Sequence, residues 1–400
     1  MPDASIAVTG VPRVPSTRPL RVGLDVRECV AGRRTGIARY VVNLVERWRT
    51  SDAIAPVFYG NQHTALPPAL AAVPVRRIAE RSTFLWDQVA LPRALAGDRV
   101  DVFLSPYYKS PFVAPCPVVI TVHDLLFLDE TAYPQRGRRR VERAAFLTLA
   151  RPMARRAARI ITDSEHSRRD VVRWLRVPGG KIRVIPIGLA PALARVDETD
   201  IARVRASYAL PERYVLYVGN FKPHKNLPRL VRAWARVDPD VRASHHLVLA
   251  GARDDAATAL DALVREVGLA GRVHCPGFVA DGDLAALYSG ATALALPSLY
   301  EGFGVPVIEA MACGTPVLCS NTTSLREVAA DAALLVDPSD ERSIADGLTR
   351  LLADADLRMR LSGAGLAHAR AFGAEISGAA IDAVLAEAAA AGRGGAGGDG

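Results

Sequence analysis

Two glutamates, Glu301 and Glu309, stand eight positions apart on either side of a glycine-containing loop. Between them, Gly302-Phe303-Gly304 provides backbone that can approach a ligand closely. Carboxylates are poor ligands for phosphate but good acceptors for sugar hydroxyls. The pair therefore suits a molecule with hydroxyls on both sides of a phosphate, as in a nucleoside diphosphate sugar. The alternative is a solvated helix residue at Glu309 and an ordinary loop charge at Glu301.

The elements around this loop would position both carboxylates. The apolar run ATALALP predicts a buried strand that Pro297 ends. Pro306 suits the first position of a short helix, and Gly314 suits its C-terminal cap. A strand, glycine loop and helix in this order point the free amides of the helix start into the loop. That end of a helix attracts an anion such as a diphosphate.

A second group of polar residues follows the predicted strand YVLYVG. Gly219 ends this strand, and Lys222, His224 and Lys225 come soon after it. Lysines placed there could hold a diphosphate and stabilise it as it leaves. Exposed lysines on a loop are the alternative interpretation.

The first half of the chain offers two candidates. Gly36 lies in the loop TGIARY after the first predicted strand, but three residues separate it from Gly32, so the G-x-G-x-x-G pattern of a dinucleotide site is missing. An ordinary tight turn is the alternative there. His123 directly follows the apolar run VVITV, at the end of a strand where ligands of parallel sheets bind. A structural histidine is the alternative to a functional one.

Apolar runs and helix-like stretches alternate along the whole chain, which predicts an α/β fold with parallel sheets. The length of 400 residues suits two domains, each of the doubly wound, Rossmann-like kind. The expected organisation is a flexible N-terminal lead, a first domain, a second domain, a C-terminal helix and a disordered glycine-rich tail, at residues 1–19, 20–190, 200–373, 374–391 and 392–400.

The segment from Glu301 to Glu309, with EGFG and EAMACGTPV, resembles the E-x7-E signature of the retaining GT-B glycosyltransferases often called family 4. The segments TGIARY, VHD, SEHSRRD and GNFKPHKN are also similar to motifs of that family. This resemblance implies two Rossmann-like domains facing across a cleft, with the acceptor held by the first and the donor mainly by the second. It also implies transfer with retention, without a metal or another cofactor, and a C-terminal helix that crosses back to the first domain.

The resemblance further implies residue roles. Glu309 would hold the ribose, Glu301 and the amides near Phe303 and Gly304 would hold the sugar hydroxyls, and His123 would orient the sugar. Lys225 would stabilise the departing diphosphate, and the family often has Arg where His224 stands, so Lys222 and His224 remain alternatives for a second positive charge. The implied catalytic residues are His123, Lys225 and Glu301. The implied donor-binding residues are Gly36, Gly219, Lys222, Lys225, Phe278, Val279, Glu301, Gly302, Phe303, Gly304 and Glu309.

The segments HDLLFLDE, LWDQVALP and YVGNFKPHKNL are most similar to bacterial mannosyltransferases that build surface polysaccharide or lipid-linked glycans. GDP-mannose is therefore the expected donor, and a glycan or lipid-linked glycan the expected acceptor. The alternatives are a sugar-nucleotide epimerase of the same fold and a non-catalytic, nucleotide-sugar-binding scaffold. A nicotinamide-dependent oxidoreductase is disfavoured by the missing glycine pattern.

Composition limits the partners. The net charge of +8 favours anionic partners without requiring nucleic acid. Five cysteines without a C-x-x-C pair indicate neither a disulfide framework nor a zinc site. No apolar run reaches the length of a membrane span, so a cytoplasmic location is expected. Asp281-Gly282-Asp283 and Asp238-Pro239-Asp240 fit a D-x-D metal motif, but both fall in turns, and helix capping explains the first more simply.

Nine arginines lie between Arg136 and Arg159, interleaved with Phe146, Leu147 and Leu149. One interpretation is a solvated helix face. Another is a basic amphipathic surface that docks on the anionic inner face of the cell membrane. Binding to nucleic acid is disfavoured because no aromatic stacking set accompanies the arginines.

Overall fold

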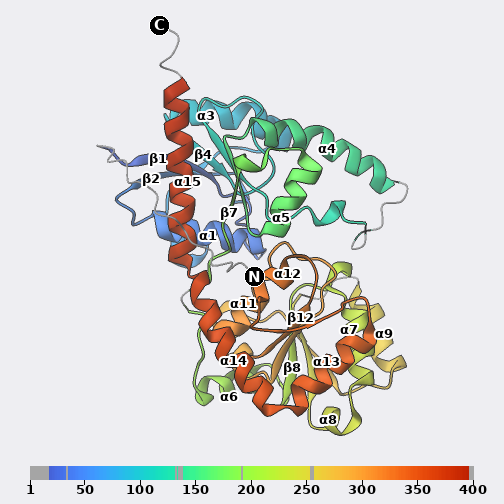
Figure 1. Ribbon diagram of the computed structural model, residues 1–400. Coiled ribbons are helices and arrows are strands. Elements are labelled where there is room, and N and C mark those ends of the chain that lie inside the picture. The colour runs from blue at the N-terminus through green and yellow to red at the C-terminus, as the bar shows by residue number, and fades with distance from the viewer. Residues whose placement is uncertain are drawn as a thin grey trace.

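The chain folds into two α/β domains, one above the other, with a long C-terminal helix beside the upper one (Figure 1). The computed structural model describes residues 18–32, 35–130, 133, 138–190, 192–252 and 256–395. Nearly all of the expected N-terminal lead, residues 1–17, and the last five residues of the expected tail lie outside this part of the chain.

The first domain contains a seven-stranded parallel sheet in the order β3-β2-β1-β4-β5-β6-β7. β4 and β5 are buried along their whole length, as expected for strands covered by helices on both faces. The strands are β1 (Leu20–Asp25), β2 (Ile54–Gly60), β3 (Val75–Arg77), β4 (Val102–Ser105), β5 (Val118–Thr121), β6 (Arg159–Thr162) and β7 (Ile182–Val184).

The helices of this domain begin where the sequence provides caps. Thr35 accepts a hydrogen bond from the amide of Ala38 at 3.0 Å and so starts α1, which packs Val41 and Leu44 into the core. Ser164 caps α5 in the same way through the amide of Ser167. The helices are α1 (Gly36–Trp48), α2 (Thr83–Leu85), α3 (Leu91–Gly97), α4 (Arg138–Arg156) and α5 (Glu165–Asp170).

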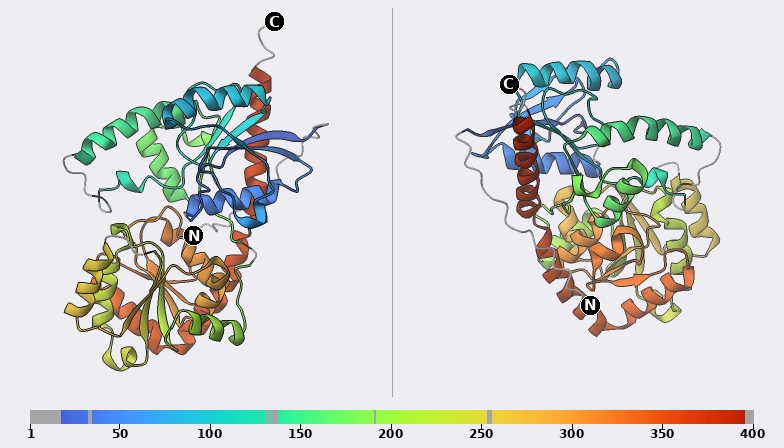
Figure 2. Two further views of the ribbon diagram at one scale, coloured as in Figure 1. Left: turned by 180° about the vertical axis from the view of Figure 1, so that it is seen from behind. Right: turned by 45° about the horizontal axis from the view of Figure 1, so that its top comes forward.

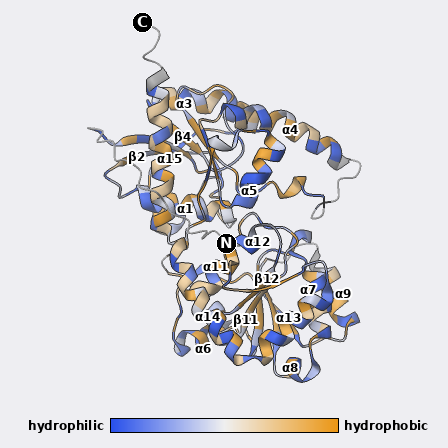
Figure 3. Cartoon of the chain, viewed as in Figure 1, coloured by the Kyte–Doolittle hydropathy of each residue, from blue (hydrophilic) through white to orange (hydrophobic). Residues whose placement is uncertain are grey.

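The second domain contains a six-stranded parallel sheet in the order β10-β9-β8-β11-β12-β13. In Figure 3 its inner strands are coloured mainly as hydrophobic, whereas its outer helices alternate between hydrophobic and hydrophilic residues. The strands are β8 (Tyr214–Val218), β9 (His246–Ala250), β10 (Val273–Gly277), β11 (Ala293–Leu296), β12 (Val317–Ser320) and β13 (Leu334–Val336). The helices are α6 (Glu198–Ser207), α7 (Leu227–Arg236), α8 (Pro239–Ala243), α9 (Ala256–Glu266), α10 (Leu284–Ser289), α11 (Val305–Ala312), α12 (Thr323–Ala329), α13 (Glu341–Ala353) and α14 (Ala355–Ala369).

The last helix, α15 (Ala374–Gly395), follows α14 and lies against the first domain (Figures 1 and 2). Its Asp382 accepts hydrogen bonds from the indole of Trp48 at 2.7 Å and from Arg47 at 2.9 Å. Its Glu387 accepts one from Arg159 at 2.6 Å. The helix continues four residues into the tail that was expected to be disordered, so that boundary was wrong. A run of alanines before Arg393 favours helix and carries it on.

Both sheets turn the carboxyl ends of their strands toward the other domain, so the loops after β1, β4, β5, β8 and β11 meet between them. In each sheet the strand order changes direction at the centre, between β1 and β4 and between β8 and β11. Ligands of doubly wound sheets bind at these points. Among the described residues, no helix is long and apolar enough to cross a bilayer.

Candidate active site

Glu301 lies in the loop between β11 and α11, and its carboxylate is held from two sides. Its Oε1 accepts hydrogen bonds from Lys225 Nζ at 2.6 Å and from Ser298 Oγ at 2.7 Å. Lys225 is only 8% exposed and stands at the end of the 3-10 turn Pro223–Lys225. The predicted phosphate-binding lysine and the predicted sugar-binding glutamate thus form one ion pair, which excludes the interpretation of exposed loop charges.

The two candidates for a second positive charge differ in burial. His224 is 5% exposed, and its burial together with Lys225 lowers the pKa of His224 to about 4. The imidazole is therefore neutral at pH 7, and its Nδ1 lies 3.1 Å from the hydroxyl of Tyr133 in the first domain. Lys222 is exposed at the rim of the same turn. Of the two, Lys222 is the one that can bring a positive charge to an anion.

Glu309 is 2% exposed, inside α11. This helix begins at Val305, one residue before the predicted start, and Gly304 at its N-cap has a φ of 102°, which favours glycine. Glu309 Oε2 accepts a hydrogen bond from the hydroxyl of Tyr288 at 2.7 Å. Its Oε1 accepts one from the guanidinium of Arg39, which belongs to the first domain. Glu309 is therefore a buried, fully paired carboxylate and not a solvated helix residue.

The sequence analysis did not identify Arg39 as a site residue, although Arg39 belongs to the same segment, TGIARY, as the candidate Gly36. Its position three residues after Gly36 places it in the first turn of α1. A contact between residues 270 positions apart leaves no local pattern. Only the placement of α1 opposite α11 shows it.

The glycine loop itself touches the first domain. A Cβ on Gly302 would lie 2.5 Å from the carbonyl oxygen of His123, so no larger residue fits without a shift. The Gly302 carbonyl accepts hydrogen bonds from the hydroxyls of Ser164 at 2.7 Å and Ser167 at 3.1 Å. The Phe303 side chain is buried against Phe372, so only the backbone of Phe303 can meet a ligand.

His123 follows β5 and lies beside the glycine loop. Its Nδ1 is 2.6 Å from Asp163 Oδ2. Burial by itself lowers the pKa of His123, but the charge and hydrogen bond of Asp163 outweigh it, so the pKa lies above the ordinary value. The buried Nε2 makes no hydrogen bond with any described residue. A buried polar atom without a partner needs an explanation, and a ligand atom is one.

The remaining predicted residues are spread along the two domain surfaces that face each other across the cleft. Gly36 begins α1, and no atom lies within 4 Å of the position that a Cβ would take. Gly219 follows β8, where a Cβ would lie 2.7 Å from the Tyr217 hydroxyl. Phe278 is exposed and Val279 buried, directly after β10. The structure therefore brings Glu301, Lys225, Gly302 and His123 together at one point, and Glu309 with the start of α1 at another.

Further contacts hold the domains together beside this site. Glu327 on α12 accepts hydrogen bonds from the backbone amides of Glu165 and His166, at 2.6 and 3.0 Å, and so caps α5 of the other domain. Tyr300 donates a hydrogen bond to Asp170 at the far end of α5. The two faces of the cleft are therefore closed on each other in this structure.

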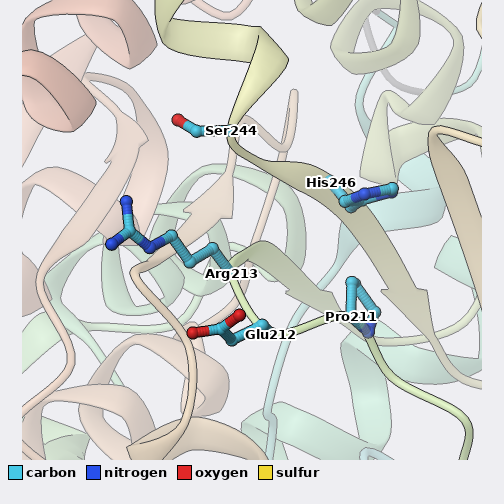
Figure 4. A pocket seen from close by; sticks show the side chains of 5 residues that line it. All are labelled: Pro211, Glu212, Arg213, Ser244 and His246. Atoms are coloured by element: carbon cyan, nitrogen blue, oxygen red, sulfur yellow. The ribbon is translucent and has the colours of Figure 1, made fainter.

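Two cavities lie away from this site, at the amino ends of the second sheet. One of about 310 Å³ is lined by Pro211, Glu212, Arg213, Ser244 and His246, which Figure 4 shows around the starts of β8 and β9. The other, of about 480 Å³, adjoins it around Arg213 and Ser244. They occupy the sheet edge opposite to Glu301. The candidate site is thus recognised by its paired side chains and not by a cavity.

The D-x-D segments make other contacts than metal coordination. Asp238 caps α8 through the amides of Asp240 and Val241. The capping prediction was wrong for Asp283, whose carboxylate instead accepts hydrogen bonds from Arg203 and Tyr208, both at 2.9 Å. These two donors compete successfully with the helix amides. Within the described ranges, no group of three or more histidine, cysteine or acidic residues could hold a metal ion.

Family models match both domains. The model described as "Glycosyltransferase Family 4" matches residues 34–193, and the model described as "Glycosyl transferases group 1" matches residues 200–367. The "O-antigen chain mannosyltransferase B" of Escherichia coli is 33% identical over 356 residues, which cover 84% of this chain and 92% of the relative.

Solved structures confirm the GT-B architecture that was predicted. Anabaena HepE, in a complex with UDP and glucose, superposes with a TM-score of 0.76 at 20% identity, over 92% of this chain and all of HepE. The sucrose-phosphate synthase of Thermosynechococcus elongatus superposes with the same score at 23% identity, over 93% of this chain and all of that one. The matches span both domains, and the chain therefore belongs to the family 4, group 1 glycosyltransferases and is a glycosyltransferase.

Proposed function

We propose that the enzyme transfers mannose, with retention, from GDP-mannose to a glycan or lipid-linked glycan in the synthesis of cell-surface polysaccharide. The observation that carries this proposal is the buried Lys225–Glu301 ion pair beside His123, whose Nε2 has no partner among the described residues. The choice of mannose is supported by the relative named as an O-antigen chain mannosyltransferase.

The donor diphosphate would lie at the start of α11, where amides after Gly304 and the positive end of the helix attract an anion. Lys225 would be close to it, because its ammonium group is fixed by Glu301 in the adjoining loop. Lys222 would approach from the rim. These charges would stabilise the diphosphate as the bond between sugar carbon and phosphate oxygen breaks.

The sugar would lie between the domains. Glu301 would accept hydrogen bonds from its hydroxyls while Lys225 keeps the carboxylate in place. His123 Nε2 would donate a hydrogen bond to another hydroxyl, because Asp163 favours the protonated imidazole. An acceptor hydroxyl would attack on the face that the phosphate leaves, and its proton would pass to the departing phosphate oxygen. That route gives retention without a covalent intermediate, a metal or another cofactor.

The nucleoside would extend from the diphosphate toward β10. Glu309 would bind the ribose hydroxyls, since it lies one turn inside the helix that would hold the diphosphate. The backbone at Phe278 and Val279 would contact the base. This orientation places nucleotide on the second domain and leaves the loops of the first domain to the acceptor.

A nucleotide-binding panel tests the donor proposal. We expect GDP and GDP-mannose to raise the melting temperature of the wild type, with or without EDTA, and UDP-, dTDP- and ADP-sugars to raise it less. The effect should largely disappear in Glu309→Ala. Stabilisation by a different nucleotide would contradict GDP-mannose, and a requirement for added magnesium would contradict the metal-free mechanism.

We also propose that α4 touches an anionic membrane surface. Its side chains Val141 and Leu149 are 69% and 50% exposed, and Arg155 and Arg156 are exposed near its end. Two other arginines of α4 make contacts within the domain instead. Arg143 lies over the ring of Trp174 at 4.5 Å, and Arg151 donates a hydrogen bond to the backbone carbonyl of Trp174. Arg136 lies outside the described residues.

Sedimentation with vesicles tests this contact. The enzyme should bind vesicles that contain phosphatidylglycerol and not those of pure phosphatidylcholine. The double variant Arg155→Glu, Arg156→Glu should lose most of that binding, whereas the matched pair Arg232→Glu, Arg236→Glu on α7 of the second domain should keep it. Equal binding by both double variants would contradict a role for α4.

A further inference from the structure

We infer that Arg39 is an internal ligand of the nucleotide site, which the donor must displace. The inference rests on the proposed role of Glu309 as the acceptor of the ribose hydroxyls. It adds a residue of the first domain to a site that is otherwise built from the second domain.

The guanidinium of Arg39 bridges two elements of the second domain. One of its nitrogens donates to Glu309 Oε1 on α11, and the other lies 3.4 Å from Asp281 Oδ1. Asp281 comes two residues after Val279, in the turn that follows β10. Because the base would contact the backbone at Val279 and the ribose would bind Glu309, the guanidinium occupies the place between them.

The carboxylate of Glu309 needs a donor at each of its two oxygens. Its side chain is almost completely buried, and Tyr288 satisfies only Oε2. A buried carboxylate with one unpaired oxygen is strongly unfavourable. Arg39 supplies the missing donor to Oε1, as a ribose hydroxyl would. A ribose hydroxyl would have to reach this oxygen from the cleft, where the guanidinium lies, so the two donors would compete for the same space.

The position of Arg39 makes the exchange easy. Its side chain is 38% exposed, in contrast to the 3% of Glu309, so the guanidinium can move into solvent once a ribose hydroxyl donates to Glu309 Oε1 in its place. The next residue, Tyr40, is fixed: its ring lies 5.0 Å from that of His123, and its hydroxyl is 3.2 Å from Thr121. The backbone of α1 therefore stays in place while the Arg39 side chain leaves.

Competition of this kind lowers the apparent affinity for the donor, because binding must first break the Arg39–Glu309 pair. Removing the guanidinium should therefore strengthen nucleotide binding. This is the opposite of what is expected for an ordinary cationic ligand of the diphosphate, whose removal would weaken binding.

Calorimetric titration with GDP tests the inference on three full-length variants. Arg39→Met keeps most of the aliphatic stem and removes the charge, and we expect it to bind GDP about threefold to tenfold more tightly than the wild type. Arg39→Lys keeps a weaker, single-point donor, so its affinity for GDP should lie between those of the wild type and Arg39→Met. Glu327→Gln is the matched control, because it weakens another contact between the domains at α5 without touching the nucleotide site.

The control separates direct competition from a general loosening of the domains. We expect Glu327→Gln to bind GDP within about twofold of the wild type, and we expect the gain of Arg39→Met to shrink in high salt, which screens the ion pair in the wild type. Equal or weaker binding by Arg39→Met would overturn the inference, as would an equal gain in Glu327→Gln. If no protein in the series bound GDP or any other nucleotide, the proposed function would fail and the inference with it.

Discussion

On the second-domain face of the cleft, the carboxylates are held by neighbours from their own domain: Glu301 by Lys225 and Ser298, and Glu309 by Tyr288. The first-domain face has His123 with Asp163, and Arg27 with Asp25 and Asp87 after β1. Around them lie loops and short helices with exposed apolar side chains at Phe84, Leu85 and Val113. The second-domain face is a set of fixed charges, and the first-domain face combines such pairs with exposed apolar side chains.

This difference separates two tasks. A nucleotide diphosphate presents the same charges and hydroxyls in every donor of a class, so fixed, buried partners suit it. Acceptors vary, and loops are where such variation is tolerated. The contacts that cross the cleft, from Arg39 and from Glu327, connect the fixed face to the variable one.

The largest effect is expected at the centre of the fixed face. Lys225→Ala should lower the rate of mannosyl transfer about 10²- to 10³-fold, because it removes the ammonium that would stabilise the leaving diphosphate and leaves Glu301 buried without its cation. The rate of transfer from GDP-mannose into lipid-extractable or polysaccharide product measures this. Lys181→Ala, at the opposite edge of the first sheet, is the control and should transfer normally. A loss of less than about tenfold in Lys225→Ala would mean that its charge is not used in the reaction.

The next largest effect is expected at Glu309. Glu309→Ala should weaken GDP binding about tenfold to a hundredfold, because hydrogen bonds to a charged group contribute about 1.5–3 kcal/mol. Calorimetric titration measures the affinity. Glu341→Ala, whose carboxylate pairs with arginines on the outer helices, should bind GDP like the wild type. An unchanged affinity for GDP in Glu309→Ala would contradict the proposal that Glu309 binds the ribose.

A third test concerns the pair of His123 and Asp163 on the first-domain face. Replacing Asp163 by Asn removes the charge that raises the pKa of His123, so burial should then hold that pKa below its ordinary value of about 6.5. In the wild type, the raised pKa contributes stability that is fully present below about pH 6.5 and is lost as the pH rises through the folded-state pKa. In Asp163→Asn the sign should reverse, because a histidine whose folded-state pKa lies below 6.5 makes the fold less stable as the pH falls.

Histidine NMR titration reads out the same pKa directly, with His123→Gln used to assign the signal among the eight histidines. A His123 pKa that is identical in wild type and Asp163→Asn would show that Asp163 does not control the imidazole. The transfer rate should follow the protonated fraction in both proteins.

The smallest effect is expected at Tyr288. Tyr288→Phe removes one hydrogen bond to Glu309 Oε2, which contributes about 1 kcal/mol, and should weaken GDP binding about fivefold or less. The direction is opposite to that expected for Arg39→Met, although both residues bond the same carboxylate. Tyr59→Phe, which loses a comparable bond to Asp98 in the first domain, is the control. Tighter binding by Tyr288→Phe would contradict its assignment to the fixed partners of Glu309.

The sequence was sufficient for the fold class because the central strands of both sheets, β1, β4, β5, β8, β11 and β12, are short and mostly buried apolar runs. It was also sufficient to single out Glu301, Glu309 and Lys225, since their spacing around glycine loops is local. Helix ends were placed less well: alanines carried α15 past its predicted end, and Asp283 did not cap α10 because Arg203 and Tyr208 bind its carboxylate.

Contacts between distant segments could not be predicted. The pairing of Lys225 with Glu301 and of Arg39 with Glu309 joins residues 76 and 270 positions apart. The sequence could not show whether Lys222 or His224 supplies the second positive charge. The structure shows that His224 is buried beside Tyr133 of the first domain, and this burial keeps its imidazole neutral. The sequence shows which residues can carry a charge, but only the three-dimensional structure shows which of them form ion pairs.

The most direct test is calorimetric titration of GDP-mannose into the wild type and into the double variant Lys225→Ala, Glu301→Ala, which removes both members of the ion pair and so leaves neither charge buried alone. We predict one site per chain in the wild type, insensitive to EDTA, and at least a tenfold loss of affinity in the folded double variant. Binding of the nucleotide sugar with equal affinity to both proteins would contradict the placement of the donor on the second-domain face.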